Sequence, residues 1–174
     1  MKRRPVVGVM GSGTREFAPH ALALGRGLAS AGVHLLTGGG GGVMAAVSSG
    51  FASVERRDGL IVGVLPAEPD DTASSPVGYP NEHVELVIRT HLTARGEDGA
   101  DVMSRNHINV LSSDVIIAMP GGTGTQSEND LAQRYQKPLV RFDPWRELTA
   151  AGDDSVVRTV EEVIAWVSGH FDRR

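Results

Sequence analysis

Apolar runs of strand length alternate with stretches of helical periodicity along the chain. Six runs have the length and composition of buried strands: residues 6–10, 33–36, 60–65, 84–88, 115–119 and 138–142. Five other stretches carry apolar residues at helical spacing: residues 21–31, 43–54, 103–111, 128–135 and 156–167. Strands that alternate with helices predict a parallel sheet with helices on both faces. We therefore expect a single Rossmann-like α/β domain over residues 1–174, with a doubly wound, mostly parallel sheet.

Two segments show neither a strand-like apolar run nor helical periodicity. Residues 66–80 hold four prolines and many Asp, Ser and Thr residues, which predicts a long loop. Residues 93–100, with the sequence TARGEDGA, are polar and contain glycine, which predicts a mobile loop at the mouth of a pocket.

The composition narrows the class of protein. Because the 174 residues include no cysteine, the chain forms neither a disulfide nor a thiolate metal site, which fits a cytoplasmic protein. The six histidines show no ligand spacing, so we expect no bound metal. A net charge of −4 argues against nucleic acid as a partner, and no apolar run approaches the ~20 residues that cross a membrane. Since nearly all the basic residues are arginines, a cation at a binding site is expected to be a guanidinium.

Three glycine-rich turns follow the first, second and fifth predicted strands. In a parallel sheet these turns meet at the carboxyl edge, where glycine lets backbone N–H groups approach an anion at a helix N-terminus. Each turn alone is also explained by a tight connection, but the five glycines of residues 38–42 exceed what a turn requires. The phosphate-binding residues predicted from the turns are Gly11, Ser12, Gly38, Gly39, Gly40, Gly121, Gly122, Thr123, Gly124 and Thr125.

The turn after the second strand also bears on the cofactor. A nicotinamide enzyme of this fold carries an acidic residue there, which binds the ribose. Glycine stands at that place in this chain. The sequence therefore argues against a dehydrogenase.

The third turn, PGGTGTQSE, ends in a glutamate that has two interpretations. Thr125 and Glu128 have the S/T-x-x-E spacing of a capping box, in which Glu128 returns to the backbone at the start of the helix. Alternatively, Glu128 lies one turn inside the helix and reaches a sugar attached to the bound phosphate. The hydroxyls of Thr123, Thr125 and Ser127 then contact the phosphate.

Arg105 and Asn106 precede the fifth strand and are further candidates. Arg105 is either a surface arginine with a buried stem or a ligand contact. The position just before the strand, together with Asn106 and Asn109, favours the second interpretation. Asn106 is expected to bond a base or a phosphate.

Three motifs together resemble the Lonely Guy family and its wider superfamily of Rossmann proteins, also labelled "possible lysine decarboxylase". The motifs are GSG after the first strand, the GGG run that continues into GVM, and PGGTGTQSE, which matches the family's PGGxGTxxE. The resemblance covers almost the whole chain. It implies hydrolysis of the N-glycosidic bond of a nucleoside 5′-monophosphate, giving a free base and ribose 5-phosphate. It also implies that Arg105 and Glu128 are the catalytic pair, that no cofactor is required, and that the chain forms a homodimer or larger homo-oligomer.

The chain departs from this family at Asn106, where the phosphoribohydrolases usually carry lysine. The run RNHINVLSSDVIIA resembles a sister branch that includes molybdenum-cofactor carrier proteins. That resemblance implies an alternative function, namely a non-catalytic carrier or sensor of a phosphorylated pterin-type cofactor or nucleotide.

Lysine decarboxylase activity is rejected on chemical grounds. A pyridoxal-phosphate enzyme needs a lysine for its Schiff base. The chain has only Lys2, before the first strand, and Lys137, at the entry to the sixth, and neither is placed near the glycine turns.

Overall fold

The computed structural model describes residues 3–147 and 156–171. Its strands are β1 Val6–Met10, β2 His34–Thr37, β3 Ile61–Leu65, β4 Leu86–Arg89, β5 Val115–Ala118, β6 Leu139–Phe142 and β7 Val156–Val157. Its helices are α1 His20–Ser30, α2 Val43–Ala52, α3 Asn106–Ser112, α4 Thr123–Arg134 and α5 Val160–Phe171, with a 3-10 helix η1 at Gly96–Asp98.

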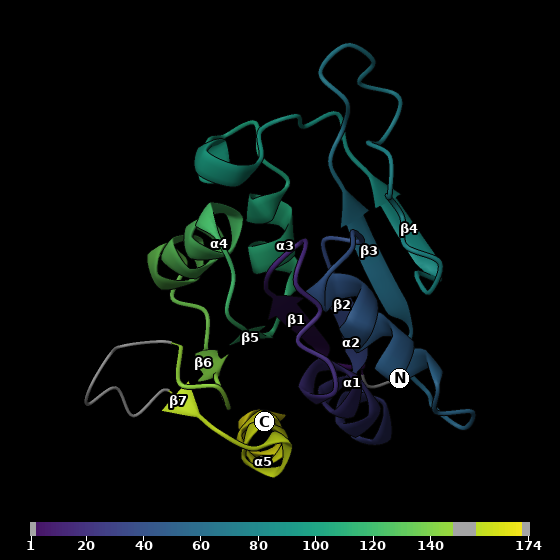
Figure 1. The fold of residues 1–174 in the computed structure, drawn as a ribbon, viewed down its shortest axis with the longest axis vertical. Helices are drawn as coiled ribbons and strands as arrows, with labels where there is room; N and C mark the ends of the chain where they lie inside the picture. Colours follow the sequence, from purple (N-terminus) through teal and green to yellow (C-terminus); the bar gives the residue numbers. More distant parts are fainter. Residues whose placement is uncertain (1–2, 148–155, 172–174) are drawn as a thin grey trace.

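All the described strands form one parallel sheet in the order β4-β3-β2-β1-β5-β6-β7. The chain winds from β1 to β4 toward one edge, then returns to β5 on the other side of β1 and continues to β7 (Figure 1). This arrangement confirms the predicted doubly wound α/β fold. The strand order reverses between β1 and β5, and ligands of such sheets bind beyond the carboxyl ends of the strands at that point.

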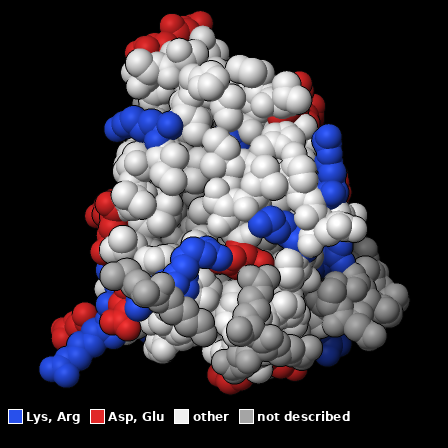
Figure 2. All heavy atoms as spheres, turned by 180° about the vertical axis from the view of Figure 1, so that it is seen from behind, with Lys and Arg blue, Asp and Glu red and all other residues white. Residues whose placement is uncertain are grey.

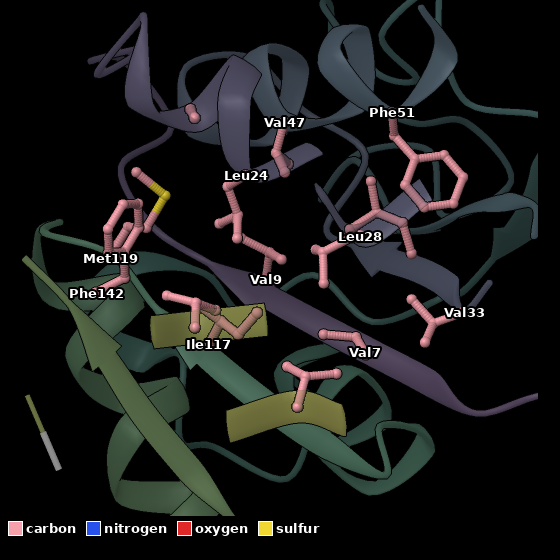
Figure 3. Close-up of a cluster of buried hydrophobic side chains, with 14 of the residues drawn as sticks. Val7, Val9, Leu24, Leu28, Val33, Val47, Phe51, Ile117, Met119 and Phe142 are labelled. Carbon is pink, nitrogen blue, oxygen red and sulfur yellow. The ribbon is translucent and has the colours of Figure 1, made fainter. Parts of the chain in front are cut away.

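The helices cover the sheet on both faces, with α1, α2 and α5 on one side and α3 and α4 on the other (Figure 1). On the first side, Val7 and Val9 of β1 point toward Leu24 of α1 and Val47 of α2 (Figure 3). A Cβ on Gly25 would run into the backbone of α2, so this glycine lets the two helices touch. Burial on both faces explains why the central strands are continuous apolar runs.

The last predicted helix, residues 156–167, is wrong at its start. Val156 and Val157 instead form β7 beside β6, and α5 begins at Val160. The physical reason is a capping box, because the backbone N–H of Glu162 donates to Thr159 Oγ1 at 3.2 Å and Glu162 Oε2 accepts from the Thr159 N–H at 3.0 Å. The apolar periodicity runs through this cap and conceals it.

On the face seen in Figure 2, charged side chains are scattered among uncharged residues, and several basic side chains stand beside carboxylates. Arg15 pairs with Glu147, and Arg57 pairs with Glu85, in ion pairs of 2.8 Å. Within the described ranges, no helix combines the length and apolar character needed to cross a membrane.

Candidate functional site

A cavity of about 300 Å³, here called the central cavity, opens beyond the carboxyl ends of β1 and β5. Most of the residues predicted from the sequence lie on its wall: Gly11, Ser12, Gly38, Arg105, Asn106, Gly122, Thr123, Gly124, Thr125 and Glu128. Its other lining residues are Val9, Met10, Gly13, Thr14, Met44, Tyr79, Arg95 and Gly96. The fold thus brings the glycine turns after β1 and β5, Gly38 of the turn after β2, and the Arg105 segment to one place.

The glycine run at residues 38–42 does not serve a ligand as a whole. Gly38 lines the central cavity, whereas Gly39 has a φ of +75° and packs against Leu65. Gly40 lies under the ring of Tyr79, and Gly42, with a φ of +59°, packs against the loop after β1. Gly39 and Gly40, which were predicted to contact phosphate, do not line the central cavity, and left-handed backbone at Gly39 and close packing at both residues account for the glycines.

Gly121, the other predicted residue that does not line the central cavity, lies against Thr125 and the backbone N–H of Ser12. It lines a neighbouring cavity instead. The backbone N–H of Ser12 also donates to Pro120 O at 3.2 Å, so the turns after β1 and β5 are held together.

The start of α4 faces the central cavity. Gly122 is its N-cap residue, and among the described residues no side chain caps this helix. The first backbone bond of the helix runs from the N–H of Gln126 to Gly122 O, which leaves the N–H groups of Thr123, Gly124 and Thr125 without helical partners. The open N-terminus of a 12-residue helix attracts an anion through these groups and the helix dipole.

Glu128 is not part of a capping box. The helix begins at Thr123, five residues earlier than predicted, so Thr125 lies inside the first turn and Glu128 in the second. Its carboxylate is 7% exposed, and Glu128 Oε1 accepts a hydrogen bond of 2.9 Å from Asn109 Nδ2 on α3. The sequence missed the early start because TGTQSE has no apolar periodicity.

Burial raises the pKa of the Glu128 carboxyl above its ordinary value, while the charge of Arg105 and the bond from Asn109 act in the opposite direction. The largest of these effects is desolvation, which disfavours the charged form. Glu128 thus holds its proton at a higher pH than an exposed glutamate does.

Arg105 occupies the N-cap position of α3 and is 8% exposed. Two of its guanidinium nitrogens, Nε and Nη1, are buried and have no hydrogen-bond partner in the described parts of the chain. The guanidinium lies directly against Gly38, where any Cβ would collide with it. A buried cation with free donors is costly unless an anion binds it. Arg105 is therefore the strongest indication of an anionic ligand in this cavity.

Asn106 has a fixed side chain. Asn106 Nδ2 donates to Ser127 Oγ at 3.1 Å, and Ser127 Oγ donates in turn to Gly124 O at 2.8 Å. The hydroxyl of Ser127, which was expected to contact phosphate, is thus held within α4, and Ser127 does not line the central cavity. Asn106 lies on the cavity wall and ties α3 to the start of α4.

The sequence did not identify Tyr79, Arg95 or Met44 as site residues. Met44 is placed at the start of α2, and Tyr79 comes from the long loop 66–80 and covers Gly40. Arg95, in the segment 93–100, is exposed and has no counterpart in the motifs. A lone aromatic or cation in an irregular segment carries no periodic signal, so only the tertiary fold locates it.

Arg95 and Gly96, in the segment 93–100, line the central cavity, so this segment borders the pocket. The segment is held by its neighbours, because Ala94 forms a β-bridge with Ser104 and the 3-10 helix η1 in its middle packs on α4. His107 links Asp101, just after this segment, to Tyr135 at the end of α4. Its Nε2 lies 3.0 Å from Asp101 O, and its Nδ1 lies 2.7 Å from the hydroxyl of Tyr135.

The structure also locates Lys137, one of the two lysines considered for a lysine decarboxylase. Lys137 Nζ donates to Leu111 O at 2.8 Å and to Ser113 O at 2.7 Å, before β5 begins. This is the opposite edge of the sheet from the central cavity. Lys2 lies outside the described residues. In the described part of the chain, no three His, Cys, Asp or Glu residues form a group able to hold a metal ion.

A doubly wound parallel sheet with an open helix N-terminus and a buried arginine at its switch point defines a Rossmann-like protein. The sequence model of the SLOG cluster4 family matches residues 4–165, and the chain belongs to this family. This assignment confirms the resemblance to the Lonely Guy superfamily.

Similar proteins come from several organisms. An uncharacterized protein of Archaeoglobus fulgidus is 31% identical over 140 residues, which cover 79% of this chain and 80% of that protein. The molybdenum cofactor binding protein of the phototrophic bacterium Rippkaea orientalis superposes with a TM-score of 0.74 at 33% identity, over 98% of this chain and 99% of the other. The Moco carrier protein of Chlamydomonas reinhardtii gives a TM-score of 0.73 at 31% identity, over 99% and 100% of the two chains.

Proposed function

We propose that this protein binds a phosphorylated pterin-type cofactor and carries it without turnover. The observation that supports this function is the buried guanidinium of Arg105, whose Nε and Nη1 have no partner in the described structure. It faces the same cavity as the open N-terminus of α4, so a phosphate at the helix start has a cation nearby. The similar proteins of Rippkaea orientalis and Chlamydomonas reinhardtii are a cofactor binding protein and a carrier of this kind.

The rest of the central cavity fits a ring attached to such a phosphate. Val9, Met10 and Met44 provide apolar surface, and the amide of Asn106 lies on the wall. Because the chain has no cysteine, a metal carried by the cofactor receives no thiolate from the protein. The protein would hold this cargo through its phosphate and its ring.

The test is the small-molecule content of the purified protein. Native mass spectrometry is expected to show a retained mass, and denaturation should release one phosphorylated pterin per chain. A ligand-free preparation is expected to melt at a higher temperature when flavin mononucleotide, a phosphate ester of a fused pteridine ring, is added. The proposal is wrong if no ligand is retained and neither this probe nor any other phosphorylated ring compound raises the melting temperature.

A second candidate function is hydrolysis of a nucleoside 5′-monophosphate, favoured by the position of Arg105 and Glu128 on one cavity wall. In this reaction water adds to the anomeric carbon and the base leaves with a proton. A buried carboxyl with a raised pKa is poorly suited to stabilise the positive charge that develops on the sugar. Incubation with AMP, followed by chromatography for adenine and ribose 5-phosphate, decides between turnover and binding.

We also propose that the chain forms a homodimer or larger homo-oligomer. Leu60, just before β3, and Leu86 and Ile88 of β4 are 38–47% exposed. They share one face of the sheet, since Val62 pairs with Leu86 in register. On this face the main contacts of α3 are with β1 and those of α4 are with β5 and β6, and both helices lie to one side of β4 (Figure 1). The strand β4 is also at the edge of the sheet. In a two-fold symmetric dimer, the β4 edge and apolar face of each copy would pack against the same surface of the other copy.

Replacing Leu86 by arginine is expected to convert the oligomer to monomers, because a charge on each copy would be buried at the contact. Light scattering after size-exclusion chromatography measures the mass. Val77, which is fully exposed in the loop 66–80, offers a matched control, and Val77→Arg is expected to leave the mass unchanged. A monomeric wild type, or an oligomer that survives Leu86→Arg, would contradict this surface as the interface.

A further inference from the structure

Three side chains that line the central cavity are ionisable acids or bases, and two of them are cations. Arg95 and Arg105 supply guanidinium groups, and Glu128 supplies the one carboxyl among the described residues of the wall. Burial raises the pKa of this carboxyl, so it offsets less of the positive charge than an exposed glutamate would. The open N-terminus of α4 adds a partial positive charge of about half a unit. The wall therefore has more positive charge than a singly charged anion requires.

The backbone of Arg95 lies beside the first turn of α4. Its neighbour Gly96 has a φ of +60°, and a Cβ on Gly124 would lie 3.9 Å from Gly96 Cα. Gly99, the residue after η1, is buried against Ser127, whose Oγ would collide with any Cβ at this position. The segment that carries Arg95 is therefore packed on the helix whose N-terminus is open.

The guanidinium of Arg95 is available to a ligand. Arg95 is exposed, and among the described residues no carboxylate pairs with it and no aromatic ring stacks on it. Arg15 and Arg57, by contrast, are each paired with a carboxylate at 2.8 Å. An unpaired guanidinium on a cavity wall offers its N–H donors to a bound anion.

The two arginines approach the cavity from different elements. Arg105 is buried, and its guanidinium lies against Gly38 after β2, whereas Arg95 is exposed and belongs to the segment packed on α4. A phosphate at the start of α4 thus has three sets of donors: the helix N–H groups, the inner guanidinium and the outer guanidinium. A phosphate monoester has three free oxygens and a charge of about −1.5 to −2 at neutral pH. A diester has two free oxygens and a single charge.

From these observations, and resting on the function proposed above, we propose that Arg95 binds the phosphate of the ligand and selects a terminal phosphate monoester over a diester. Arg105 and the N–H groups at the start of α4 hold two of the phosphate oxygens. The guanidinium of Arg95 donates to the third oxygen from the solvent side. In a diester that oxygen carries the second substituent, so the contact is lost and the remaining charge is smaller.

The test compares two flavins that share the ring and the sugar chain and differ in the phosphate. Flavin mononucleotide is a monoester, and riboflavin 4′,5′-cyclic phosphate is a diester. Fluorescence titration of the ligand-free protein gives both Kd values, at a pH above the second pKa of the monoester, which is about 6. Because the cyclic ester also differs in shape, the informative quantity is the change in the ratio of the two Kd values between wild type and variants.

Arg95→Met is expected to raise the Kd of flavin mononucleotide about tenfold and that of the cyclic ester less, because a charge-assisted contact to the monoester is removed. Arg95→Lys retains the positive charge and is expected to retain most of the preference for the monoester. Arg26→Met is the matched control, since Arg26 is exposed on α1 and does not line the central cavity, and both Kd values are expected to stay unchanged. Each variant exchanges an exposed side chain, so the melting temperature of the ligand-free protein should not change.

The outcomes separate this inference from the proposed function. If Arg95→Met binds flavin mononucleotide as tightly as wild type does, or weakens both esters equally, the role of Arg95 is overturned and the carrier function stands. If wild type binds neither flavin but retains a phosphorylated ligand on purification, native mass spectrometry of Arg95→Met decides, and undiminished retention overturns the role of Arg95. If wild type binds neither flavin and retains no phosphorylated ligand, both proposals are overturned.

Discussion

Replacing Arg105 by methionine is expected to make the ligand-free protein more stable and to weaken its binding of a phosphorylated ligand about 100-fold. The two effects have opposite signs because they share one cause. The guanidinium is buried and two of its nitrogens have no partner in the described structure. Burial of a charge that has no partner carries a desolvation penalty on the order of several kcal/mol, and an apolar side chain of similar volume does not have this penalty. Removal of one partner from a buried charged contact with a ligand costs about 2–5 kcal/mol of binding.

Calorimetry measures the first effect as a rise in Tm of several degrees for the ligand-free variant. Titration with flavin mononucleotide measures the second as an increase in Kd. Arg134→Met is the matched control, because Arg134 is exposed in the last turn of α4, and it is expected to change neither quantity appreciably. A variant with lower Tm and unchanged Kd would show that Arg105 supports the fold and does not bind an anion.

The strands β1 to β6 and their direction could be predicted from the sequence because each is a short apolar run followed by glycine or a polar turn. The residues at which the helices begin were harder to predict from the sequence. At α4 the polar sequence TGTQSE hid the beginning of the helix, and at α5 the pair Thr159 and Glu162 formed a cap that the apolar pattern crossed. In both cases local hydrogen bonding at the helix end decided the boundary, whereas periodicity reports only the buried face.

The position of the site followed from the fold class, since turns after parallel strands meet at one edge of the sheet. The side-chain contacts between elements could not be predicted from the fold class. Gly38 is explained by the guanidinium of Arg105, and Gly40 is explained by the ring of Tyr79, which comes from a distant loop. A glycine run looks the same in sequence whether a ligand or a side chain of the protein fills the space above it.

Replacing Glu128 by glutamine is expected to stabilise the protein at neutral and alkaline pH and to have little effect near pH 4. Burial raises the pKa of this carboxyl above its ordinary value of 4.5, so the folded chain holds a proton that the unfolded chain releases. The stability of wild type therefore falls as pH rises above the ordinary value, and it levels off once the folded pKa is passed. Each pKa unit of this increase corresponds to a loss of about 1.4 kcal/mol in the free energy of unfolding above the folded pKa.

The free energy of unfolding, measured by chemical denaturation at several pH values, is expected to show a growing difference between Glu128→Gln and wild type. Glu161→Gln, on the exposed side of α5, is the control and is expected to show no such growth. A difference that is constant with pH would contradict a raised pKa of Glu128. The same variant also bears on function, because glutamine retains the size of Glu128 and is expected to preserve ligand binding. Hydrolysis would instead require the carboxylate, so a carrier retains its affinity in Glu128→Gln, whereas a phosphoribohydrolase loses its release of free base.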